Sequence, residues 1–182
     1  LALRANGTVV HWGDITRGPV PTGLSNVVAV AVSFFSVALK SDGTVVVWAA
    51  PQPEISNIPP AATNIMAIGA APGAIIGLRH DGSLIAWGWD QRLTALPPNL
   101  SNVVQIAVGP NHAWARKSDG SIVGWGANFD GQAVTPPGLG PVLSIEAGQS
   151  TSFAVKPDFT IHRWGGPDEN EVPPGITGIA EV

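Results

Sequence analysis

A tight turn followed by tryptophan recurs five times along the chain, and this regularity restricts the fold more than any other feature. The tryptophans lie at positions 12, 48, 87, 125 and 164, so the intervals are 36, 39, 38 and 39 residues. Each follows one of these turn pairs: Asn6-Gly7, Asp42-Gly43, Asp81-Gly82, Asp119-Gly120 and Asp158-Phe159. Self-similarity at such a period is typical of solenoids, propellers and repeat arrays.

Each unit contains four short segments with the character of strands. In the fourth unit, residues 103–107 alternate apolar with small or polar side chains, which is strand periodicity. Residues 113–117 precede the Asp-Gly turn, residues 121–125 follow it and end at the tryptophan, and residues 132–136 end in proline. No segment has helical periodicity over an adequate length. Four antiparallel strands in about 38 residues describe a propeller blade.

The turn pairs predict hairpins between the second and third strands. Asn-Gly and Asp-Gly favour type I′ turns, in which both central residues have positive φ. Asp158-Phe159 is the exception, because phenylalanine is strained at positive φ. We therefore expect a different turn type or a longer hairpin there.

These patterns predict an all-β fold, a five-bladed β-propeller with four-stranded antiparallel blades in a single domain of residues 1–182. The repeat units cover approximately residues 1–26, 27–64, 65–102, 103–141 and 142–175. The chain begins at the second strand of a unit and ends after a first strand, so residues 176–182 would complete the N-terminal blade and close the ring. Closure removes free strand edges and predicts a monomer. The alternative is an arc cut from a larger ring.

Composition and charge exclude several classes of function. The formal net charge is -4 and the nine basic residues are scattered, which argues against a nucleic-acid groove. No run of 18 apolar residues is present, so we expect no membrane contact. The chain has no cysteine, its four histidines lie in different units, and no nucleophile motif or phosphate-binding glycine loop occurs. We therefore expect no metal, no cofactor and no enzymatic activity.

The fourth unit resembles the regulator of chromosome condensation repeat. The matching positions are Val103 to Val108, Gly109, His112, Ala115, Asp119-Gly120, Trp125-Gly126, Asn128 and Gly131-Gln132. The chain is similar also to secreted bacterial β-lactamase inhibitors built from such repeats, which favours a secreted or cell-surface bacterial domain. The resemblance implies a propeller; those relatives have seven blades, and the five units here depart from that count. The nucleotide-exchange role of the eukaryotic family is not expected, because this acidic chain shows no matching basic tail.

Aromatic residues that break the repeat indicate a binding surface. In a propeller, the loop between the first and second strands and the loop between the third and fourth strands share one face of the ring, which we name the loop face. The predicted surface on it comprises Phe34, Phe35, Trp89, Asp90, His112, Phe129 and Asp130. Aromatic anchors ringed by polar groups are typical of interface hot spots. The alternative is that Phe34 or Phe35 is buried in its own blade, since that loop is one residue shorter than its equivalents.

The sequence therefore favours a non-enzymatic module that binds a protein partner through the loop face. A carbohydrate-binding, lectin-like propeller is the alternative, but a lectin would repeat its ligands in every blade, and Trp89 and Phe129 are not repeated. An engineered ring without a partner is a third reading.

Overall fold

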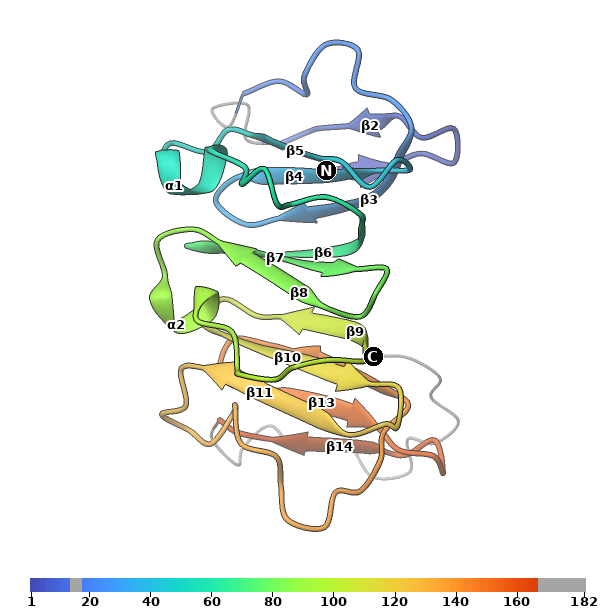
Figure 1. Cartoon of the computed structure of the whole chain (residues 1–182), viewed down its shortest axis with the longest axis vertical. Helices are drawn as coiled ribbons and strands as arrows, with labels where there is room; N and C mark the ends of the chain where they lie inside the picture. The colour runs from blue at the N-terminus through green and yellow to red at the C-terminus, as the bar shows by residue number, and fades with distance from the viewer. Residues whose placement is uncertain (14–17, 167–182) are drawn as a thin grey trace.

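The computed structural model describes residues 1–13 and 18–166, which form antiparallel sheets arranged in chain order (Figure 1). Sheet 1 pairs β1 (Ala2–Leu3) with β2 (Val9–Val10). Sheets 2 to 5 have three strands each. They are β3–β4–β5 (Val27–Val32, Ser36–Lys40, Val45–Trp48), β6–β7–β8 (Ile65–Ala71, Ala74–Arg79, Leu84–Trp87), β9–β10–β11 (Val103–Val108, His112–Lys117, Ile122–Gly126) and β12–β13–β14 (Ser144–Ala147, Ser152–Val155, Ile161–Trp164).

Each of sheets 2 to 5 is a simple antiparallel meander, with the second strand of the unit in the middle. The alternating apolar residues that predicted strands do form them, because period-two patterns place one set of side chains on each face. The middle strands are the most deeply buried: Ile75, Ile76 and Leu78 of β7 have no exposed surface. The all-β prediction is confirmed, with two one-turn helices added.

The turns differ from the type I′ prediction. Among the described turn residues, the glycines have positive φ and the aspartates before them do not. In the second unit the Gly43 N–H donates to the Lys40 carbonyl and the Lys40 N–H donates to the Thr44 carbonyl, both at 2.9 Å. These bonds define a three-residue loop with a left-handed final residue. Asp42 Oδ1 accepts from the hydroxyl and N–H of Thr44, and these bonds lower the Asp42 pKa to about 2.

Phe159 keeps the same turn in spite of its side chain. Its φ is 61°, and its N–H donates to the Lys156 carbonyl at 2.8 Å, as glycine does in the other units. The expected change of turn type or longer hairpin was wrong. Phe159 therefore adopts the positive φ that is unfavourable for a residue with a bulky side chain.

The predicted fourth strands are absent from the described sheets. After β5 the chain forms α1 (Pro53–Ser56), and after β8 it forms α2 (Gln91–Thr94). After β11 it makes turns at the corresponding place. Helix α1 begins with Pro53, and α2 is capped by Asp90. Each helix directs one apolar side chain inward, Ile55 in α1 and Leu93 in α2, and neither side chain has exposed surface. One buried residue in four is the spacing of a helix, whereas a strand would bury every second residue. This spacing explains why a helix forms where a fourth strand was predicted.

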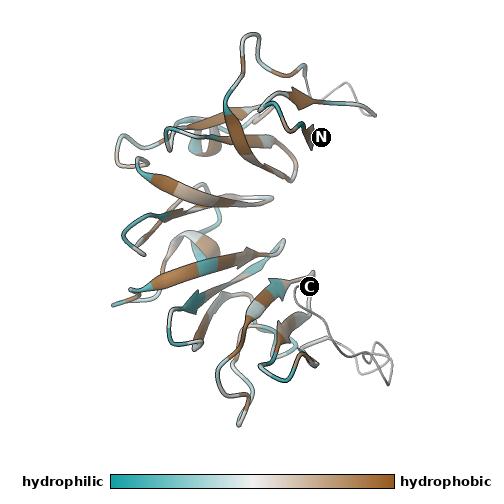
Figure 2. Cartoon of the chain, turned by 90° about the vertical axis from the view of Figure 1, so that its right-hand side faces the viewer, coloured by the Kyte–Doolittle hydropathy of each residue, from teal (hydrophilic) through white to brown (hydrophobic). Residues whose placement is uncertain are grey.

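The described sheets form an arc that does not close. Sheets 1 and 5 lie at opposite ends of the molecule in Figure 1, and Figure 2 shows the same arc from its side, with apolar residues running along the strands. The predicted closing strand, residues 176–182, lies outside the described residues. The closed ring of five blades is therefore not observed.

Apolar side chains fill the space between consecutive sheets. Each of sheets 2 to 5 places its repeat tryptophan in the core that it shares with the preceding sheet. Trp87 Nε1 donates to the Ile55 carbonyl at 3.1 Å, and Trp125 Nε1 donates to the Leu93 carbonyl at 2.9 Å. A carbonyl oxygen in the helix of one unit thus accepts a hydrogen bond from the tryptophan of the next unit. This bond positions the loop that contains the helix.

Candidate interaction surface on the loop face

Backbone hydrogen bonds fix the two kinds of loop together on one face. The Asp90 N–H donates to the Gly73 carbonyl at 2.9 Å, joining the loop after β8 to the loop before β7. In sheet 4 the Ala127 N–H donates to the Asn111 carbonyl at 2.8 Å, which makes the equivalent link. In each of these two units the two kinds of loop therefore lie side by side at the same end of the strands.

Three aromatic side chains project from this face into solvent. Phe34 is 64% exposed, Trp89 is 49% exposed and Phe129 is 86% exposed. They come from sheets 2, 3 and 4 in succession, so each sheet in the middle of the arc contributes one. Large apolar side chains exposed on one face are characteristic of interaction sites.

Trp89 rests on the backbone of the neighbouring loop. A Cβ atom placed on Gly73 would lie 2.7 Å from two atoms of the indole ring, so only glycine permits this approach. One side of the ring is thus packed and the other faces solvent. The indole is held in a fixed orientation, which lowers the entropy lost when a partner binds.

Asp90 has a structural role rather than an exposed one. It is 6% exposed and caps α2, where its Oδ1 accepts from the Arg92 N–H at 3.0 Å. Arg92 also forks onto both carboxylate oxygens, with Nη2 2.8 Å from Oδ2 and Nε 3.0 Å from Oδ1. The Arg92 side chain, followed by backbone bonding, holds the Asp90 pKa below its usual range. Of this pair the guanidinium, with about half of its side chain exposed, is the group that faces solvent.

His112 is also buried, in the core between sheets 4 and 5. Its Nε2 lies 2.9 Å from Ser152 Oγ. That hydroxyl donates to the Gln132 carbonyl at 2.9 Å and accepts from Trp114 Nε1 at 2.8 Å. A hydroxyl has a single proton, so His112 Nε2–H must be the donor to it. Burial lowers the pKa of the imidazole to about 4, so His112 is neutral at physiological pH.

The remaining two predicted residues divide between core and surface. Phe35 has no exposed surface and belongs to the core between sheets 2 and 3, which is the alternative that its short loop left open. Asp130 is exposed beside Phe129, and its N–H donates to Gln132 Oε1 at 2.9 Å. Four of the seven predicted residues thus remain available to a partner: Phe34, Trp89, Phe129 and Asp130.

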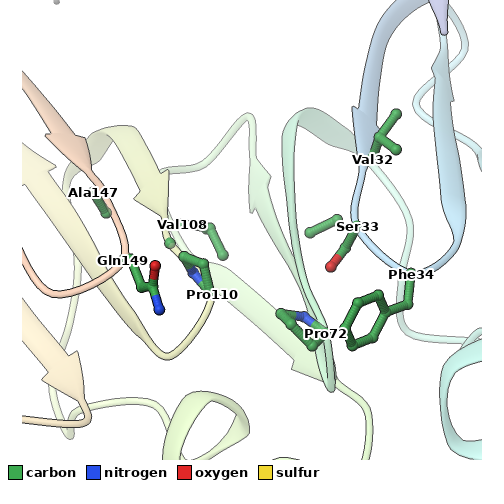
Figure 3. Close-up of a pocket in the computed structure, with 10 residues that line it drawn as sticks. Val32, Ser33, Phe34, Pro72, Val108, Pro110, Ala147 and Gln149 are labelled. Atoms are coloured by element: carbon green, nitrogen blue, oxygen red, sulfur yellow. The ribbon is translucent and has the colours of Figure 1, made fainter.

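A groove of about 480 Å³ opens where the inner strands, the first strands of sheets 2 to 5 (β3, β6, β9 and β12), reach the loop face (Figure 3). Phe34 and Pro72 lie on one side of it, and Pro110 and Gln149 lie on the other. The whole lining comes from equivalent positions of four sheets: Val32, Ser33, Phe34, Ala70, Pro72, Val108, Gly109, Pro110, Ala147 and Gln149. No lining residue carries a charge, so the groove suits an uncharged, largely apolar group.

Sequence reasoning missed the groove and the apolar row on the inner strands. Val28, Met66, Val104 and Leu143 lie at one repeat position and are 41–54% exposed. Their intervals of 38, 38 and 39 residues were visible in the sequence. In the sequence these positions are part of the alternation of apolar with small or polar residues, which predicts only that the first segment of each unit is a strand.

The described part of the chain has no group of three histidine, cysteine, aspartate or glutamate side chains suited to a metal. Within residues 1–13 and 18–166, no helix is long and apolar enough to cross a membrane.

The comparisons with known proteins identify the repeat. The family model of the Regulator of chromosome condensation (RCC1) repeat matches residues 103–132. The resemblance expected from the sequence is therefore confirmed for the fourth unit. No curated protein matches the chain at the level of sequence.

Solved propeller structures resemble most of the chain. A structure of Kap60 bound to yeast RCC1 (Prp20) matches with a TM-score of 0.65 and 17% identity, over 90% of this chain and 49% of that one. The structure of Prp20p from Saccharomyces cerevisiae, described with its binding to Gsp1p and histones, matches with a TM-score of 0.57 and 19% identity. This match covers 72% of this chain and 43% of that one. The CRINKLY WD40 ectodomain of the Arabidopsis thaliana receptor kinase ACR4 matches with a TM-score of 0.62 and 22% identity. This match covers 75% of this chain and 49% of that one.

These likenesses show a β-propeller-like fold. The chain spans about half the length of the solved structures that it matches. At these identities the similarity describes architecture, and the functional site must be argued from the residues of this chain.

Proposed function

We propose that the chain is a non-enzymatic protein-binding module whose partner contacts the loop face through Phe34, Trp89 and Phe129. The observation that carries the proposal is their exposure on one face of three consecutive sheets. Asp130 and the Arg92 guanidinium supply polar groups around them.

Leaving these three aromatic rings in water has an energetic cost. Burying apolar surface stabilises by about 25 cal/mol per Å², so an exposed aromatic ring contributes to folding far less than a buried one. Placing three such rings on rigid loops gains little for the fold. The same rings would supply the aromatic anchors on which binding energy usually concentrates.

The matched structures support a protein partner in general terms. Prp20 was solved with Kap60 bound, and its binding to Gsp1p and histones was described. Those partners belong to that protein, and none of them is proposed for this chain. What carries over is the principle that a propeller offers a rigid face to another protein.

The test is a capture experiment with the immobilised chain and lysate, measured by quantitative mass spectrometry. We compare the wild type with the triple variant Phe34→Ala, Trp89→Ala, Phe129→Ala. A specific set of proteins should be captured by the wild type and depleted at least tenfold by the triple variant.

Phe159→Gly is the matched control. Phe159 is 47% exposed but lies in a turn between the second and third strands, at the opposite ends of the strands from the loop face. This variant should capture the same proteins as the wild type. If the triple variant captures them equally well, the loop face is not the binding surface.

A further inference from the structure

We infer that Asn6 is a site of spontaneous deamidation, at which the side-chain amide is lost and the residue becomes the aspartate that the other four units carry. Asn6 is the only asparagine of the chain that a glycine follows. It lies in the turn between β1 and β2, at the opposite ends of the strands from the loop face. The site is therefore separate from the proposed binding surface.

The reaction joins the main chain of Gly7 to the side chain of Asn6. Glycine favours it, because no side chain obstructs the approach of its main-chain nitrogen. The Gly7 nitrogen gives its proton to the solvent, forms a bond to Cγ of Asn6 and displaces the side-chain nitrogen, which leaves as ammonia. Water then opens the cyclic succinimide. Opening at Cγ leaves aspartate, and opening at the main-chain carbonyl carbon leaves isoaspartate, in which the main chain runs through the side-chain carbonyl.

The native turn holds both reacting groups in hydrogen bonds. The Gly7 N–H donates to the Arg4 carbonyl at 2.9 Å. Asn6 Oδ1 accepts from the Thr8 hydroxyl at 2.7 Å and from the Thr8 N–H at 3.2 Å. The attack requires both groups to leave these partners, so it proceeds from a locally opened turn. The rate in the folded chain therefore depends on the strength of these bonds.

The native turn accepts aspartate at this position. In the second unit, Asp42 Oδ1 accepts from the Thr44 hydroxyl at 2.6 Å and from the Thr44 N–H at 3.0 Å, the bonds that Asn6 makes in its own turn. Asp42 Oδ2 also lies 3.1 Å from Lys40 Nζ, and Arg4 occupies the position of Lys40 in the first unit. Aspartate at position 6 would therefore keep the bonds of the turn and gain a cationic neighbour.

Isoaspartate does not fit the same turn, because it lengthens the main chain before Gly7 by one methylene group. The Gly7 carbonyl accepts from the Val27 N–H at 3.0 Å and so joins the first unit to the second. The equivalent bond to the following unit is made by the carbonyls of Gly43, Gly82 and Gly120. A displaced Gly7 would lose this bond, so isoaspartate should weaken the junction that aspartate preserves.

The experiment incubates the 182-residue chain in mildly alkaline buffer, with and without guanidinium chloride. Peptide mass spectrometry follows each asparagine, with a fragmentation method that distinguishes aspartate from isoaspartate. We expect Asn6 to be the first asparagine lost, and to be lost more slowly in the folded chain than in denaturant. Thr8→Val removes the hydroxyl donor and should speed the reaction in the folded chain by about twofold to tenfold, the weight of one hydrogen bond. In denaturant, where the turn is absent, the same variant should leave the rate unchanged.

Thr44→Val is the matched control, because it removes the same bond from a turn that contains no asparagine. It should leave the rate at Asn6 unchanged. The proposal is overturned if another asparagine is lost first, if the rate is equal with and without denaturant, or if Thr8→Val reacts as slowly as the wild type.

The variant Asn6→Asp reproduces the expected product. It should melt no lower than the wild type, whereas chains that carry isoaspartate should melt at a lower temperature. A lower melting temperature of Asn6→Asp would mean that the turn rejects aspartate, and that result overturns the proposal as well. None of these results bears on the loop face, which is tested by capture.

Discussion

The indole Nε1 of Trp125 donates to the carbonyl oxygen of Leu93, 2.9 Å away in the preceding unit. Leu93 lies in α2, and both residues are buried in the core between sheets 3 and 4. The bond ties the fourth unit to the third, and Trp87 makes the same contact with Ile55 between the third unit and the second. Stability in the arc therefore depends on junctions between neighbouring sheets.

Trp125→Ala should destabilise the fold by roughly 3–5 kcal/mol, the cost of a large core truncation. Urea denaturation at equilibrium measures this loss. Trp125→Phe retains the apolar ring but leaves the Leu93 carbonyl without its donor, at a cost of about 1–3 kcal/mol for that group.

Trp164→Phe is the matched control for the hydrogen bond. Trp164 Nε1 is buried and has no hydrogen-bond partner, so the phenylalanine loses none there. Trp125→Phe should consequently cost more than Trp164→Phe. Equal costs would mean that the bond to the α2 carbonyl contributes nothing to the junction.

The three strands of each of sheets 2 to 5 were predictable because one short pattern recurs at nearly constant spacing, whereas the predicted fourth strands did not form. The turn type could not be predicted, because Asp-Gly occurs both in two-residue hairpin loops and in three-residue ones. Asp81 Oδ1 accepts from the N–H and hydroxyl of Ser83, which favours the longer loop. The small polar residue two positions after each aspartate was the signal that would have indicated it.

Phe159→Gly should be neutral or stabilise by up to about 1 kcal/mol. It relieves a non-glycine residue at a φ of 61°, a conformation that costs L side chains about 1–2 kcal/mol. The ring is 47% exposed, so little packing is lost with it. Thermal unfolding followed by circular dichroism provides the measurement. A loss above about 1 kcal/mol would show that the side chain contributes more than the turn costs.

Stability should fall as the pH drops from about 6.5 to about 4, through the range in which His112 is neutral in the fold and protonated in the unfolded chain. The unfolded state binds the extra proton there, so protonation favours unfolding. At 1.36 kcal/mol per pKa unit, the loss reaches roughly 3 kcal/mol.

Denaturant unfolding between pH 4 and pH 7 measures this dependence. His112→Asn should be less stable at neutral pH and should lose much of the decline over this range. His80→Asn, which alters an exposed histidine, serves as the control and should retain it. A decline that His112→Asn leaves unchanged would assign the acid sensitivity to other groups.

The candidate site was predictable only where residues depart from the repeat. Phe34, Trp89 and Phe129 break it and are exposed, whereas Phe35 breaks it and is buried. Asp90 and His112 are polar, and sequence alone gave no reason to bury them. Their burial depends on partners far along the chain, such as Ser152 for His112, or on a local cap that requires α2 to form.

Phe129→Ala should leave the melting temperature nearly unchanged, because 86% of the side chain is exposed. Trp89→Ala should cost about 2–3 kcal/mol, less than Trp125→Ala, because only about half of the Trp89 side chain is buried. Each should weaken binding of the captured partner by roughly 1–3 kcal/mol in a calorimetric titration. If Trp89→Ala unfolds the protein as severely as Trp125→Ala does, the indole belongs to the core and is no anchor.

Photo-crosslinking at single positions tests the loop-face account most directly. A benzophenone amino acid replaces either Phe129 on the loop face or Phe159 in the opposite turn, and each protein is irradiated with the captured partner. The account predicts a covalent adduct from position 129 and none from position 159. Adduct formation from position 159 alone would contradict it.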